Sequence, residues 1–232
     1  MSLGKYALKS IGTFPFGQPV QEVVQKDRTP KNVFILGVYA SAVHARWVNT
    51  SEKTIVNALA VANEPYIFWR GENAEFIIQE IAIPKELGKL IPAKQDFNGP
   101  SGLALDNLIL NPLELDRPDV WLCDLVPHSC VNSSQRRAIE RAYLPIVSKY
   151  GLAKHTVPPV PNLLTDENRR KMISDEIIES EAQVLILLGD KPIQWFLSYF
   201  VNHWRKLSDF GRDDQSYGQL HNAQVGGKEI KV

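Results

Sequence analysis

The stretch NVFILGVYASAVHARW, residues 32–47, decides the fold class. It opens with the apolar run Val33–Leu36, meets Gly37 and turns polar within a few residues. A short apolar run of this kind suits a strand that is buried on both faces, as in a parallel sheet. Two further apolar runs, Val120–Val126 and Val184–Leu188, are ended by a proline and a glycine. The three runs therefore predict buried strands of one parallel sheet.

Helical patterns lie between these runs. The cap signal Asn132–Ser134 predicts a helix towards Tyr150, and Thr165 is expected to cap another helix. Strands that alternate with helices predict a three-layer α/β/α sandwich with a central, mainly parallel sheet. The segments His44–Val48 and Thr54–Ala62, joined by polar residues, predict a β-hairpin insertion with an exposed Trp47.

Length and composition restrict the class of protein. The 232 residues suit one α/β domain, which we expect at residues 32–232, after a basic N-terminal arm at residues 1–31. Lys+Arg and Asp+Glu both number 26, so a DNA partner would need a local basic face. No stretch reaches about 18 consecutive apolar residues, so no membrane span is expected. Two cysteines suit reduced thiols in a cytoplasmic protein, and we expect no metal and no cofactor.

The predicted topology gathers polar residues at one edge of the sheet. In parallel α/β sheets, ligands bind outside the carboxyl ends of the strands. The loops after the three apolar runs are therefore expected to meet. This neighbourhood contains Tyr39, Ser41, His44, Asp124, His128, Asp190 and Lys191.

Several interpretations of this neighbourhood stay open. Ser41, His44 and Asp124 could act as nucleophile, base and acid, but the Gly-x-Ser-x-Gly elbow is absent and a helix-cap serine is the alternative. His44 and His128 could bind a metal with Asp124, although their spacing matches no closed zinc pattern. A carboxylate at the end of so apolar a strand must be solvated, hydrogen-bonded or functional. For Asp124, a turn role before Pro127 is the alternative to a functional one.

Four segments in order carry a resemblance to a known family. They are Phe34–Ser41, Asn98–Gly102 with the following Leu105–Leu108, Asp119–Val126, and Glu179–Gly189. As an ordered set they resemble a divergent branch of the uracil-DNA glycosylase superfamily. The first is similar to the superfamily's strand and water-activating loop, and the third to the strand that ends in a base-reading Asn. The fourth is similar to the helix–strand–glycine segment before the last helix.

The resemblance implies a four-stranded α/β/α sandwich and a DNA-repair hydrolase that extrudes a damaged base and cleaves its N-glycosidic bond. On this interpretation the candidate catalytic residues are Tyr39, Ser41, His44 and Asp124. The candidate substrate-binding residues are Gly37, Val38, Ala40, Ser101, His128 and Gly189. The candidate phosphate contacts are Arg136, Arg137 and Lys191, for which a solvated helix surface is the alternative.

The sequence departs from the family pattern in three places. Most branches carry a carboxylate or amide just after the first glycine, where this chain has Val38 and Tyr39, although one branch with an apolar loop is active. Asp124 replaces the base-reading Asn, and an ionised Asp suits a donor-rich base such as adenine better than uracil. The His-Pro motif expected after the final strand is missing, because the sequence stops at Val232. We therefore expect the domain to be truncated at its C-terminal end.

Two classes of function remain. The first is a base-excising N-glycosidase that acts on damaged DNA bases or on nucleotides. The second is a non-catalytic module on the same fold that binds nucleic acid or a nucleotide. Zero net charge and the apolar first loop favour the second class, while the pocket-forming strands, His44 and Asp124 favour the first.

Overall fold

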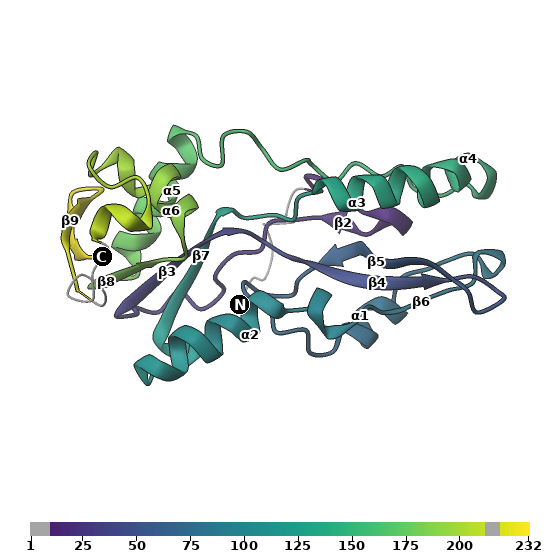
Figure 1. Ribbon diagram of the computed structural model, residues 1–232, viewed down its shortest axis with the longest axis horizontal. Helices are drawn as coiled ribbons and strands as arrows, with labels where there is room; N and C mark the ends of the chain where they lie inside the picture. The colour runs from purple at the N-terminus through teal and green to yellow at the C-terminus, as the bar shows by residue number, and fades with distance from the viewer. Residues whose placement is uncertain (1–9, 212–218) are drawn as a thin grey trace, which may run out of the picture. The chain divides into compact units, whose positions relative to one another are not determined.

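The computed structural model describes residues 10–211 and 219–232 (Figure 1). The chain divides into two compact units, between which it alternates. We call the first the hairpin unit; it consists of Met1–Val23, Ala40–Leu105 and His128–Val160. We call the second the parallel-sheet unit; it consists of Val24–Tyr39, Asp106–Pro127 and Pro161–Val232.

The parallel-sheet unit contains the strands that the apolar runs predict. Its strands are β7 (Val120–Val126), β3 (Val33–Tyr39), β8 (Val184–Leu187), β10 (Lys228–Lys231) and β9 (Asn222–Val225), in that order across the sheet. β3 runs parallel to both β7 and β8, and β10 runs parallel to β8. Only β9 is antiparallel, because it forms a tight hairpin with β10. The expected mixed α/β class with a mainly parallel sheet is therefore confirmed. The sheet has five described strands rather than the four that the resemblance implies, because β9 pairs with β10 as an antiparallel edge strand.

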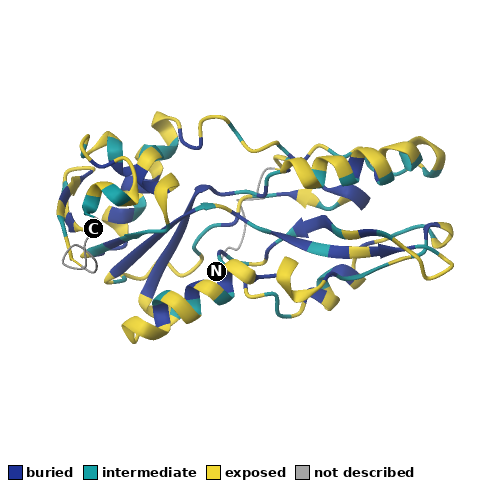
Figure 2. Ribbon diagram, in the orientation of Figure 1, coloured by how far each residue is buried: buried dark blue, intermediate teal, exposed yellow. Residues whose placement is uncertain are grey.

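The core of this unit is centred on β3 and β7. Phe34, Ile35 and Leu36 are fully buried, and β7 is buried along its whole length (Figure 2). Burying one such side chain contributes about 1.5–3 kcal/mol, so these strands account for much of the stability. Helix α5 (Glu167–Glu179) contacts β7, and α6 (Asp190–Trp195) contacts β3 and β8.

The cap of α5 differs from the prediction. Asp166, not Thr165, is the N-cap residue, and its carboxylate accepts a hydrogen bond from the Arg169 backbone N–H at 2.7 Å. The Thr165 hydroxyl instead donates to the Trp195 carbonyl. Either residue type can cap a helix, so composition alone could not separate the two neighbours.

The hairpin unit is built on the predicted hairpin. β4 (Ala42–Val48) and β5 (Thr54–Asn63) pair antiparallel, which confirms the prediction, and β6 (Lys89–Pro92) pairs with the other edge of β4. The prediction that Trp47 is exposed is wrong. Trp47 is 1% exposed, and its indole N–H donates to the Leu87 carbonyl at 2.8 Å. Leu87 lies in the turn Lys85–Leu87 that precedes β6, a strand that was not predicted from the sequence.

Part of the expected N-terminal arm belongs to the core of the hairpin unit. β1 (Gly12–Thr13) pairs with β2 (Pro19–Val20), and the turn between them buries Phe16. The Phe16 ring packs edge-on against Trp47 at 5.3 Å and Tyr143 at 5.1 Å. Residues 10–20 are therefore held by aromatic packing, while residues 1–9 lie outside the described part.

The remaining helices of the hairpin unit are short. They are α1 (Ala74–Gln79), α2 (Pro100–Leu105), α3 (Ser133–Ala138) and α4 (Val147–Tyr150). Asn132 caps α3 as predicted, and Gly151, at φ 61°, ends α4. In the described part of the chain, no helix is both long enough and apolar enough to cross a bilayer.

Candidate functional site

The predicted site residues fall in both units. The parallel-sheet unit contains Gly37, Val38, Tyr39, Asp124, Gly189 and Lys191. The hairpin unit contains Ala40, Ser41, His44, Ser101, His128, Arg136 and Arg137. The Asp124 site lies within the parallel-sheet unit, at the edge where β3, β7 and β8 end.

Asp124 is the central residue of this edge. It lies near the carboxyl end of β7, in register with Gly37 on β3. The residue is 4% exposed, and within residues 10–211 and 219–232 no group donates a hydrogen bond to its carboxyl. Burial raises the pKa of Asp124 from 3.8 to about 7, although the positive charge of Arg169 opposes that rise. Near neutral pH this carboxyl therefore exists in both its neutral and its ionised form.

Arg169 of α5 holds the end of β7 in place. Its guanidinium donates to the Asp124 backbone carbonyl at 2.6 Å and to the Leu125 carbonyl at 3.1 Å. Glu176, two turns further along α5, lies 3.8 Å from the guanidinium and also accepts the Trp121 indole N–H at 3.0 Å. Arg169 was not among the residues predicted from the sequence. The signal for it was the seven-residue spacing to Glu176, which places opposite charges on one helix face.

The ends of β3 and β8 complete this edge. Val38 and Tyr39 end β3 without a carboxylate or amide, and the Tyr39 side chain is 41% exposed. The Leu188 backbone N–H donates to the Leu36 carbonyl at 3.0 Å, which extends the pairing beyond β8. Gly189 then turns the chain into α6 at φ 88°, a conformation that favours glycine. Lys191 is exposed in the first turn of α6.

Ser41 and His44 are held in the hairpin unit through their backbones. The Ser41 N–H donates to the Glu64 carboxylate at 3.0 Å, and its carbonyl accepts the Ser129 hydroxyl. The Asn98 amide bonds both the N–H and the carbonyl of His44, at 2.8 and 2.9 Å. Across the described residues, no hydrogen bond joins the Ser41 hydroxyl to the His44 ring, whose buried Nδ1 lacks a partner. Burial lowers the pKa of His44, so the imidazole is neutral at neutral pH.

The glycine segment that carries part of the resemblance has a packing role. A Cβ on Gly99 would lie 2.0 Å from the Arg70 carbonyl carbon, and one on Gly102 would lie 2.2 Å from the Phe68 oxygen. Both glycines therefore permit two backbone segments to touch. Ser101 lies exposed between them.

His128 makes local contacts. Its Nδ1 lies 3.1 Å from the Ser129 carbonyl and 3.8 Å from the Cys130 sulfur. Burial raises the pKa of Cys130 to about 11, so the thiol is a weak nucleophile at neutral pH. In the part of the chain that the structure describes, no three His, Cys, Asp or Glu residues are grouped to hold a metal ion.

The predicted phosphate contacts on α3 line two separate pockets of the hairpin unit. Arg137 lines a pocket of about 750 Å³ together with Arg141 and Phe97. Arg136 lines a second pocket, of about 340 Å³, with His155. Glu140 lines both pockets, so a carboxylate lies beside each arginine.

Comparisons of the chain with protein-family models, with curated proteins and with solved structures found no match. The resemblance to the uracil-DNA glycosylase superfamily therefore remains a prediction from the ordered motifs.

Proposed function

We propose that this protein is a uracil-DNA glycosylase-like N-glycosidase of the α/β/α type that removes a damaged base from nucleic acid. In this reaction water adds to the anomeric carbon of the sugar, the C–N bond breaks, and the base leaves with a proton. Asp124 reads the edge of the extruded base. The ordered motifs and the mainly parallel sheet support the proposal.

One observation carries it: a buried carboxyl whose pKa burial raises to about 7, at the carboxyl end of a parallel sheet. Burial disfavours the ionised form of a carboxyl, and carboxyls perturbed in this way are concentrated at functional sites. Arg169 fixes the backbone on which this carboxyl sits, so its position is defined. Gly37, its neighbour on β3, has no side chain that would occupy the space beside it.

The pKa of Asp124 changes the expected choice of base. An ionised carboxylate only accepts hydrogen bonds and suits the amino group of adenine or its analogues. Because burial raises the pKa to about 7, the neutral form is also present, and it offers one O–H donor and one carbonyl acceptor. This is the donor–acceptor pair of an amide, which matches the carbonyl and ring N–H of uracil or hypoxanthine.

A non-catalytic binding module is the second candidate. Val38 and Tyr39 offer no carboxylate or amide where a water-activating group is expected after the first glycine. Such a module would use Asp124 to read a base or nucleotide and would leave the glycosidic bond intact.

The test measures abasic-site formation in labelled oligonucleotides that carry uracil or hypoxanthine. The wild-type chain is compared with Asp124→Ala, Asp124→Asn and the exposed control Asp175→Asn. We expect wild-type excision of uracil to fall as pH rises through about 7, because the donor is lost. The asparagine variant should keep its activity across this range, and the alanine variant should lose it.

The outcomes separate the candidates. Asp124-dependent binding without excision would favour the binding module. Excision that is equal in the wild type and the alanine variant would remove Asp124 from the site.

A further inference from the structure

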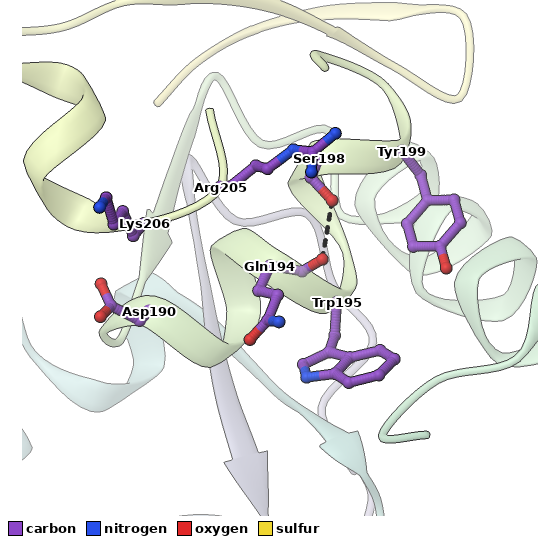
Figure 3. A pocket seen from close by; sticks show the side chains of 7 residues that line it. All are labelled: Asp190, Gln194, Trp195, Ser198, Tyr199, Arg205 and Lys206. Atoms are coloured by element: carbon purple, nitrogen blue, oxygen red, sulfur yellow. Dashed lines mark hydrogen bonds between the residues drawn. The ribbon is translucent and has the colours of Figure 1, made fainter. Parts of the chain in front are cut away.

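A pocket of the parallel-sheet unit lies beside α6, and Asp124 is not among the residues that line it. It holds about 650 Å³ and is lined by α6, by the turn Leu197–Tyr199 and by residues 205–206 (Figure 3). Of the neighbourhood predicted from the sequence, Asp190 lines this pocket, whereas Asp124 does not. Its lining combines two cations, two aromatic rings, an amide, a hydroxyl and the Asp190 carboxylate.

The two cations are Arg205 and Lys206. In the described part of the chain, neither side chain forms a salt bridge or a hydrogen bond. Their backbone N–H groups instead donate to the Asp209 carboxylate at 2.8 and 3.1 Å. The Asp190 carboxylate accepts the Leu207 N–H at 2.8 Å. The segment is therefore anchored through its backbone, while both positive side chains stay available to a ligand.

The aromatic part of the pocket is Tyr199. Its side chain is 57% exposed, although tyrosine usually buries much of its ring. The Arg170 guanidinium lies over this ring, 3.6 Å from its centroid. One face of the ring is therefore fixed by a cation, and the exposed area is open to a planar group. Trp195 adds a second ring to the lining.

We propose that this pocket binds single-stranded nucleic acid, with Arg205 and Lys206 on backbone phosphates and Tyr199 stacked on one base. Uncommitted cations beside an exposed ring match the way in which proteins bind single strands without reading sequence. A duplex keeps its bases stacked on one another, so Tyr199 would have no partner there. The proposal rests on the proposed function, because extruding a base requires a grip on the strand.

The test is fluorescence anisotropy with an undamaged, fluorescein-labelled deoxythymidine strand of about 12 nucleotides. Binding is measured from about 50 to about 200 mM KCl. The double variant Arg205→Ala/Lys206→Ala should lower the slope of log affinity against log salt by about 1.4, since each single-strand phosphate contact contributes about 0.7. The matched control Lys53→Ala/Lys171→Ala removes the same charge from exposed positions outside the pocket and should leave the slope unchanged.

Stacking has its own pair of variants. Tyr199→Ala should weaken binding about 5- to 150-fold, the range expected for the loss of one stacked base, while Tyr199→Phe should bind like the wild type. A strand with abasic sites should bind the wild type and Tyr199→Ala equally. An equal salt slope in the pocket and control variants would overturn the proposal. The proposal would also be overturned if thymidine monophosphate displaced the labelled strand at the strand's own concentration. The pocket would then be a site for a free nucleotide.

Failure of this proposal and failure of the glycosidase can be told apart. Asp175→Asn, an exposed position outside both sites, should keep the wild-type affinity for the undamaged strand. If no chain excises a base but the salt slope falls as expected, the glycosidase fails and the strand site stands. If excision occurs but the slope is unchanged, the strand site fails alone.

Discussion

Replacing Asp124 by asparagine should remove a pH dependence from the stability of the protein. Burial holds the pKa of this carboxyl at about 7 in the native chain, against 3.8 when exposed. The native state therefore binds a proton more tightly than the unfolded state. The resulting stabilisation is complete below the unfolded value, is lost as pH rises between the two values, and is absent above about pH 7.

The size of the effect follows from these two values. They differ by about three pH units, and each unit corresponds to about 1.4 kcal/mol, so the full change is about 4 kcal/mol. Asparagine has nearly the same shape and carries no charge at any pH. Relative to the wild type, the variant should gain about 4 kcal/mol of unfolding free energy between about pH 4 and about pH 8.

Urea unfolding of both chains across this pH range measures the difference. Subtracting the two chains cancels the other titrating groups, such as His44 and His155, whose pKa values burial lowers. A carbon-13 NMR titration of the Asp124 carboxyl gives the pKa directly. The reasoning is refuted if the difference between the unfolding free energies of the two chains changes by less than about 1 kcal/mol across this pH range. The carboxyl would then titrate as an exposed group.

Three further predictions concern stability, each measured by urea unfolding. Arg169→Lys should lower the free energy of unfolding by about 1.5–3 kcal/mol, because lysine keeps the charge but cannot bond both carbonyls at the end of β7. An unchanged urea midpoint would contradict this role. Gly102→Ala should lower the free energy of unfolding by more than about 2 kcal/mol, because its Cβ would lie 2.2 Å from a backbone oxygen. The control Gly151→Ala, which has open space around its Cβ, should lower it by about 1 kcal/mol. Trp195→Phe should leave stability unchanged or raise it by about 1 kcal/mol, because the buried indole N–H has no acceptor among the described residues; a large loss would reveal a missed partner.

The strands of the parallel sheet were predictable because burial on both faces leaves a direct trace in sequence. Val33–Leu36 and Val120–Val126 read as continuous apolar runs, and both are buried strands. Asp124 stood out for the same reason, as a carboxylate inside such a run. β9 and β10 are joined by Gly226–Gly227, and a glycine pair between two short strands is typical of a tight hairpin.

Other parts of the fold could not be predicted, because their contacts involve backbone atoms or distant segments. Arg169 bonds main-chain carbonyls, and any residue type supplies a carbonyl. The burial of Trp47 depends on the carbonyl of Leu87 and on β6, which lies about 40 residues along the chain. The pocket beside α6 depends on Arg205 and Lys206, which lie in a segment that no periodic pattern marks.

The alternation of the chain between its two units has a consequence for synthesis on the ribosome. The hairpin unit has all its segments once Val160 has emerged, whereas the parallel-sheet unit also needs β8 and β10, from residues 184–231. During that interval β7 is available to pair with β3, and the edge of β3 that later receives β8 keeps its backbone N–H and C=O groups unpaired. Long-range parallel pairing is slow and leaves such edges exposed to aggregation. The nascent chain should therefore depend on chaperones most strongly between the emergence of β7 and that of β8.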